Sequence, residues 1–91
     1  MITAIILLNT RHDAINEVGQ KLASVKGVSE VYSVSGRFDL VAILRIENIE
    51  ALARLSTEKL AIIDGITHTE SMIAFKKISP DDIAGMFDLG N

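Results

Sequence analysis

The sequence contains no cysteine or tryptophan, a single proline, and only one tyrosine and three phenylalanines. Without cysteine the chain can form no disulfide, no thiolate metal site and no cysteine nucleophile. Histidine is also scarce, with only His12 and His68. No His-x-x-x-His metal motif, catalytic carboxylate pair or glycine-rich phosphate loop is present. We therefore expect no metal site and no cofactor.

Concentrated positive charge is absent as well. Nine Lys and Arg residues stand against twelve Asp and Glu, and the only adjacent basic pair is Lys76–Lys77. Binding to nucleic acid by phosphate neutralisation needs a concentrated basic surface, so no direct nucleic-acid binding is expected. The apolar residues 1–8 are too few to span a bilayer and lack the features of a signal peptide. We expect a cytoplasmic protein without membrane contact.

Aliphatic side chains make up most of the hydrophobic residues, which are 48% of the chain. A chain of 91 residues fits one domain. A domain of this size buries only roughly 60–65% of the surface that its unfolded form exposes. The apolar content exceeds what one small monomer can hide, which favours an oligomer.

Comparison of the chain with itself reveals an internal repeat at an offset of 38 residues. The aligned segments are 22–31 with 60–69 and 4–8 with 42–46. Both halves read as strand, helix, glycine turn and strand, with Gly27 and Gly65 at the turns, where positive φ costs glycine nothing. A two-fold repeat is too short for a solenoid and indicates one domain built from two similar units.

The first unit begins with a strand at residues 2–9. Thr10 or Asp13 can cap the following helix, whose apolar face is formed by Ile15, Val18, Leu22 and Val25. Residues 28–35 alternate as a second strand: Val28, Glu30, Tyr32 and Val34 are expected on one side, and Ser29, Val31, Ser33 and Ser35 on the other. Residues 36–39 then end this strand, and the next strand is expected at residues 40–46.

The second unit starts with Asn48 as the expected cap of a helix. Leu52, Leu55 and Leu60 are its apolar anchors, and residues 66–77 form a long final strand. Residues 1–78 thus form the domain. Residues 79–91 form a tail, and Ser79, Pro80 and the acids after them are typical of a short helix start.

The strands differ in polarity, and this difference predicts their order. Residues 2–8 and 40–46 are apolar on both faces, so these strands belong in the centre, with 28–35 and 66–77 at the edges. Right-handed crossovers then give a ferredoxin-like α+β fold, β-α-β-β-α-β, with a four-stranded antiparallel sheet and two helices on one face.

Such a sheet leaves one apolar face without helices. Residues such as Ile5, Leu7, Val41 and Ile43 would meet water there, although the sequence does not fix which set points outward. At about 25 cal/mol per Å² of apolar area, exposing several such side chains costs many kcal/mol. The sheet of a second subunit is the simplest cover.

The run Ser35-Gly36-Arg37-Phe38-Asp39 allows two interpretations. It is an ordinary hairpin loop in which glycine supplies an unusual φ and the aspartate caps free amides. Alternatively, it binds a small zwitterion, with Arg37 contacting a carboxylate and Asp39 an ammonium. The two remain open.

Polar residues on the last strand are equally ambiguous. Thr67, Thr69 and Ser71 form a hydroxyl row that could contact the same ligand, or they reflect the β-propensity of threonine. His68 and Glu70 could act as an acid–base pair. The polar side of an edge strand is the favoured explanation for them.

With these residues in view, the chain resembles the effector domain of Lrp/AsnC-type regulators, also called the RAM domain. The resemblance runs from residue 1 to about 78, and its most specific matches are Gly36, Asp39 and Thr69. It implies the ferredoxin-like fold, homodimers formed through the sheets, and rings of dimers such as octamers or decamers that bind small amino acids. Carried over by position, the effector contacts are Gly36, Arg37, Phe38, Asp39, Thr69 and Ser71.

Two departures from the family pattern have consequences. The family usually begins with a helix-turn-helix, and nothing precedes the first strand here, so the chain resembles stand-alone members and is expected to lack DNA reading in cis. Arg37 and Phe38 stand where the family often has an acid and tyrosine, which bears on ligand identity.

The leading functional hypothesis is a non-enzymatic, amino-acid-binding oligomerisation module. It would regulate transcription or metabolism indirectly, through co-assembly with full-length relatives. One alternative is a small dimeric α+β-barrel enzyme, an oxygenase or isomerase, with His12 or His68 in a closed pocket. Another is a purely structural oligomerisation module, with no pocket at the Gly36–Asp39 loop.

Overall fold

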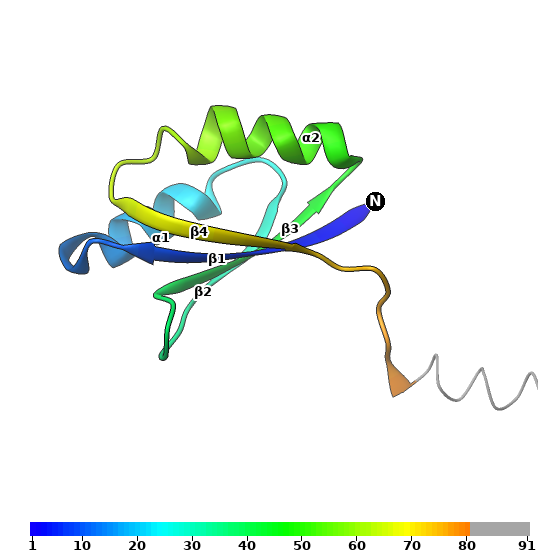
Figure 1. The fold of residues 1–91 in the computed structure, drawn as a ribbon, viewed down its shortest axis with the longest axis horizontal. Helices are drawn as coiled ribbons and strands as arrows, with labels where there is room; N and C mark the ends of the chain where they lie inside the picture. Colours follow the sequence, from blue (N-terminus) through cyan, green and yellow to red (C-terminus); the bar gives the residue numbers. More distant parts are fainter. Residues whose placement is uncertain (81–91) are drawn as a thin grey trace, which may run out of the picture.

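The computed structural model describes residues 1–80, and Figure 1 shows a sheet with helices packed on one side. The strands are β1 (Ile2–Thr10), β2 (Val28–Ser33), β3 (Leu40–Ile46) and β4 (Ile66–Ile73). The helices are a short 3₁₀ turn η1 (His12–Ala14), α1 (Ile15–Ala23) and α2 (Ile49–Arg54), and α2 continues as a π-helix, η2 (Leu55–Leu60). This element order is the predicted β-α-β-β-α-β arrangement.

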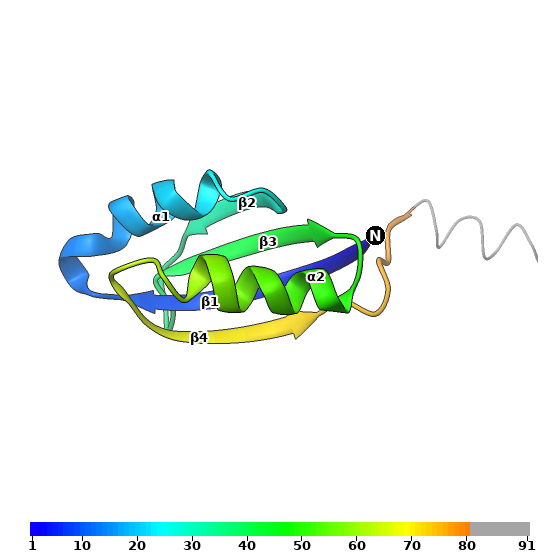
Figure 2. The ribbon, with the colours of Figure 1, turned by 90° about the horizontal axis from the view of Figure 1, so that it is seen from above.

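The sheet confirms the predicted strand order. Its strands run β2-β3-β1-β4, and each neighbouring pair is antiparallel. The two apolar strands, β1 and β3, lie in the centre. Figure 2 shows α1 and α2 above the same face of the sheet. The ferredoxin-like fold is therefore confirmed.

The core lies between this face and the helices. Alternate residues of β1 and β3 enter it, because successive side chains of a strand point to opposite faces. The helices contribute their predicted apolar positions. The buried side chains are Ala4, Ile6, Leu8, Ala14, Val18, Leu22, Leu40, Ala42, Leu44, Ile46, Leu52, Leu55 and Leu60.

The opposite face of the sheet, called here the open face, carries no helix. Its central residues are Ile5, Leu7, Val41 and Ile43, and each is only partly buried. The sequence left open which apolar set points outward, and the structure assigns this one. Two edge residues extend the apolar surface: Met72, opposite Ile5, is 49% exposed, and Tyr32, opposite Val41, is 50% exposed.

The start of the first helix differs from the prediction. Neither Thr10 nor Asp13 caps α1, since no side-chain cap bond is found at this described helix end. Thr10 is instead the buried last residue of β1, and its hydroxyl donates to the Arg11 carbonyl at 2.9 Å. The Ala14 amide donates to the same carbonyl at 3.0 Å and closes η1. The chain thus turns into the helix through backbone bonds.

Both edge strands are shorter than predicted. The pairing of β2 shifts between Val28 and Glu30, so Val28 packs against the core while Glu30 and Tyr32 lie on the open face. The strict alternation expected for residues 28–35 is therefore wrong at Val28, because a β-bulge changes its phase. The predicted final strand, 66–77, ends at Ile73.

Other local predictions are confirmed. The Asn48 side chain accepts a bond from the Ala51 amide at 2.8 Å and caps α2. Gly27 and Gly65 have φ of 101° and 104° at the equivalent turns of the two units. Most of the tail proposed as a short helix, residues 81–91, lies outside the described residues.

Candidate functional site

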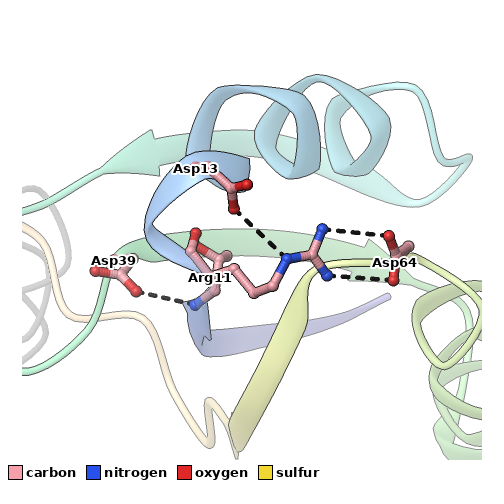
Figure 3. Close-up of polar contacts among 5 residues, drawn as sticks. Arg11, Asp13, Asp39 and Asp64 are labelled. Atoms are coloured by element: carbon pink, nitrogen blue, oxygen red, sulfur yellow. Dashed lines mark hydrogen bonds and ion pairs between the residues drawn. The ribbon is translucent and has the colours of Figure 1, made fainter.

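The loop between β2 and β3 is anchored by Asp39. Its carboxylate oxygen Oδ2 accepts a hydrogen bond from the Thr10 amide at 2.9 Å, as Figure 3 shows. The Asp39 amide donates to the Leu8 carbonyl at 2.9 Å, and its carbonyl accepts from the Val34 amide at 3.1 Å. Asp39 therefore fixes the base of the loop to the end of β1. It caps an amide, as the hairpin-loop interpretation expected, but the amide belongs to Thr10, 29 positions away.

The tip of the loop is open to solvent. Gly36 has φ of 113°, and a Cβ added there would meet nothing within 4 Å. Arg37 is exposed, and its guanidinium carbon lies 5.9 Å from the ring centroid of the half-buried Phe38. Within residues 1–80 no carboxylate pairs with Arg37. A cation held over an aromatic ring remains available to an anionic ligand.

Thr69 and Ser71 occupy a different surface. They pair with Leu8 and Ile6 of β1, two buried residues, so their side chains point to the helix side of the sheet. There they line a groove of about 440 Å³ between β4 and η2. Thr67 and Ser56 also line it, together with apolar residues such as Leu60 and Ile63.

The structure does not bring all six predicted contacts into one pocket. The groove contains Thr69 and Ser71, but none of the loop residues Gly36–Asp39 is among its lining residues. The loop follows the edge strand β2, whereas β4 forms the other edge of the sheet. Within one chain, the loop residues and the two hydroxyls therefore do not line the same groove.

A second charged cluster, which sequence reasoning missed, lies beside the loop. The Arg11 guanidinium donates to both carboxylate oxygens of Asp64 at 3.3 Å, and its Nε lies 3.5 Å from an Asp13 oxygen (Figure 3). The Arg11 amide also donates to the Gly65 carbonyl at 2.9 Å. Arg11 and Asp64 are 53 positions apart, so only the fold pairs them. The cluster ties the end of β1 to the turn before β4.

The hydrogen bonds and charge of Arg11 lower the pKa of Asp64 below its ordinary value of 3.8. Because folding depresses this pKa, the ionised carboxylate contributes stability above pH about 4, and the contribution is lost as the pH falls through the folded-state value. Asp64→Asn should therefore lower the stability of the fold slightly at pH 7, since exposed ion pairs contribute little. Urea unfolding at pH 7 and pH 3 measures this.

We expect the difference between Asp64→Asn and wild type to shrink at pH 3. Asp13→Asn is the matched control, because Asp13 lies on the same guanidinium but makes no bidentate bond. A difference that grows on acidification would contradict the assignment of this ion pair.

Ionisable groups also flank the open face. Glu30 accepts a hydrogen bond from the Tyr32 hydroxyl, and this bond, with the charge of Glu30, raises the pKa of Tyr32. On the other edge, His68 Nε2 lies 3.6 Å from Glu70 Oε2. These pairs frame the apolar centre of the face.

Neither a cluster of metal ligands nor a membrane-spanning helix is found among residues 1–80. No group of three or more His, Cys, Asp or Glu side chains there could hold a metal ion. None of the helices in the same range has the length and apolar character needed to cross a membrane.

Comparison with known proteins now decides the family. The model of the Lrp/AsnC ligand binding domain matches residues 3–83. The chain belongs to this family. The match includes all four strands and both helices, and with them the loop, the groove and the open face.

Relatives more than 30% identical to this chain include one known from its sequence and one known from its solved structure. An uncharacterised HTH-type transcriptional regulator of Pyrococcus horikoshii, PH1916, is 33% identical over an alignment of 82 residues that covers 87% of this chain and 55% of that protein. The chain thus spans about half the length of the curated relatives that it matches. The solved structure of TTHA0845 from Thermus thermophilus is 35% identical, with a TM-score of 0.82 over 87% of this chain and 99% of that one.

A more distant structure shares the fold alone. It is the transcriptional regulator NMB0573 of Neisseria meningitidis in complex with L-Met, which is 18% identical with a TM-score of 0.78. The alignment spans 86% of this chain and 52% of the Neisseria chain.

Proposed function

We propose that this Lrp/AsnC domain is a non-enzymatic sensor of a small amino acid that works only when chains assemble. The observation that carries the proposal is the separation of its polar groups. Asp39 and the exposed Arg37 lie in one loop, and of the two Asp39 carboxylate oxygens only Oδ2 accepts a bond from the described residues. The hydroxyls of Thr69 and Ser71 lie in a groove at the other edge of the sheet. Neither set alone encloses a zwitterion.

Assembly would begin at the open face. Its partly buried aliphatic centre and its half-exposed edge residues suit the sheet of a second copy. Two sheets that pack face to face bury this surface on both partners at once, in an isologous contact. The resulting homodimers would join into rings, and the effector would bind where two dimers meet.

In this arrangement each candidate contact has a chemical role. Arg37 binds the ligand carboxylate, and Asp39 Oδ1, which accepts no bond from the described residues, binds the ammonium. Gly36 lets the backbone approach the ligand, and Phe38 limits the size of its side chain. Thr69 and Ser71 supply hydroxyls from the second chain. Regulation would follow from ligand-dependent assembly, alone or with full-length relatives.

Isothermal titration of the assembled protein with each of the twenty amino acids tests the proposal. L-Met is included because the Neisseria relative was solved with it. We expect a heat of binding with one or a few small amino acids, and a change of oligomer size with the same ligands. A folded protein that gives no heat with any of them would not be an amino-acid sensor.

Asp39 provides the sharpest mutational test. Asp39→Asn keeps an oxygen that accepts from the Thr10 amide but removes the negative charge, whereas Asp39→Ala removes both. If Asp39 binds the ammonium, both variants should lose ligand affinity by more than about tenfold while the dimer remains. Titration and sedimentation of the two variants measure this. Normal binding by Asp39→Asn would show that Asp39 only positions the loop.

The enzyme alternative predicted a closed pocket between sheet and helices with a histidine directed into it. In the described part of the chain, aliphatic residues fill that space. His12 is exposed, and His68 is 57% exposed beside Glu70. His68 also lines the groove between β4 and η2, but it and Glu70 are both more than half exposed, so its surroundings are not the closed pocket that this alternative requires.

A further inference from the structure

The segment after β4, residues 74–80 and called here the arm, carries a fully exposed aromatic side chain. Phe75 has a relative exposure of 102%, and Ile78 is 73% exposed. The start of the arm is bonded to the sheet, since the Ala74 amide donates to the Thr3 carbonyl at 2.9 Å. An exposed phenylalanine leaves a large apolar area in water, so its burial against an apolar surface would be favourable.

The direction of the arm indicates where that surface is. Figure 1 shows the arm turning away from α2, to the side of the sheet opposite that helix. This is the side of the open face. Met72 on the open face is 49% exposed and precedes Phe75 by three positions, whereas Ile73, 42% exposed, pairs with the buried Ala4 and points to the helix side.

The charges of the arm match those of the open face. Lys76 and Lys77 follow Phe75, and no carboxylate of residues 1–80 pairs with them. On the open face Glu30 and Glu70 lie at the two edges, whereas Arg45, opposite Thr3, lies at the end nearest the arm of the same chain, so the acids suit the arm of a partner better than its own. An apolar anchor followed by two cations thus fits an apolar surface edged by acids.

We propose that the arm clasps a second copy of this chain, with Phe75 packed on the partner's open face and Lys76 and Lys77 near its acidic edge. The inference rests on the sheet-to-sheet dimer proposed above and adds an anchor to it. Twofold symmetry gives two such arms per dimer, one from each copy. The arm would thus raise the affinity of the dimer beyond what the sheets provide.

The test compares dimer dissociation constants by sedimentation equilibrium on the full chain. Phe75→Ala should weaken the dimer by about tenfold for each arm, or about 100-fold for the pair. Ile62→Ala is the matched control, because Ile62 is 75% exposed in the turn before β4 and outside the open face. Lys76→Glu combined with Lys77→Glu should also weaken the dimer, most strongly at low salt.

A photoreactive phenylalanine analogue at position 75 identifies the binding surface. In mixtures of isotopically light and heavy chains, we expect light–heavy cross-links to peptides of β1, β2 or β3. Cross-links confined to one chain, or a wild-type dissociation constant for Phe75→Ala, would overturn the role of the arm. If Ile43→Lys disrupts the dimer while Phe75→Ala does not, the proposed role of the arm is wrong and the sheet-to-sheet contact is supported. A monomeric wild type overturns both.

Discussion

Ile43→Lys is expected to convert the assembled protein into a folded monomer. Ile43 lies at the centre of the open face and is only partly buried in a single chain, so a lysine there can extend into water without disturbing the core. In a sheet-to-sheet dimer the same lysine would be an unpaired buried charge, which costs about 3–5 kcal/mol for each copy. The dimer should therefore weaken by at least about 100-fold.

Sedimentation velocity over a concentration series measures this change, and circular dichroism confirms that the fold remains. Ile43→Val is the matched control, because it removes one methylene and introduces no charge, so it should change the dissociation constant only a few-fold. An Ile43→Lys protein that sediments like wild type would show that the open face is not the contact.

Gly65→Ala is expected to destabilise the fold more than the same substitution at Gly27 or Gly36, the other described glycines with positive φ. Gly65 has φ of 104°, and a Cβ there would lie 2.9 Å from the Ala14 Cβ and 3.0 Å from Val18 Cγ2. The backbone conformation costs an alanine about 1–2 kcal/mol, and the overpacking adds about 1–3 kcal/mol. We therefore expect a loss of about 2–5 kcal/mol in the free energy of unfolding.

Gly36→Ala separates the two contributions. Gly36 has a similar φ of 113°, but an added Cβ would meet nothing within 4 Å, so only the backbone cost applies. Urea unfolding of both variants should give a larger loss for Gly65→Ala. Equal losses would mean that the packing of the turn against η1 and α1 contributes nothing.

The sequence predicted the architecture because its signals were local and strong. The two-sided apolar character of β1 and β3 placed them in the centre, and Asn48 and the turn glycines marked helix ends that the structure confirms. The errors arose where tertiary contacts override local preference. Thr10 was expected to cap a helix, but its amide bonds to Asp39, 29 positions away, and it ends a strand.

The candidate site was less predictable for the same reason. A hairpin loop and a hydroxyl row can be recognised in one sequence, but their separation on the folded chain depends on the strand order. The Arg11–Asp64 pair and the π-helical turn beside the groove depend on contacts that no spacing rule contains. The phase of β2 depended on a bulge, which a strict period of two cannot describe.

The proposed dimer, the ligand site and the clasping arm all require that this chain associates with a second copy of itself. Sedimentation equilibrium of the wild-type chain at low micromolar concentration tests it most directly. We predict a mass of at least twice the 9.9 kDa of one chain, rising further when the effector is added. A stably folded species of 9.9 kDa under these conditions would contradict the account.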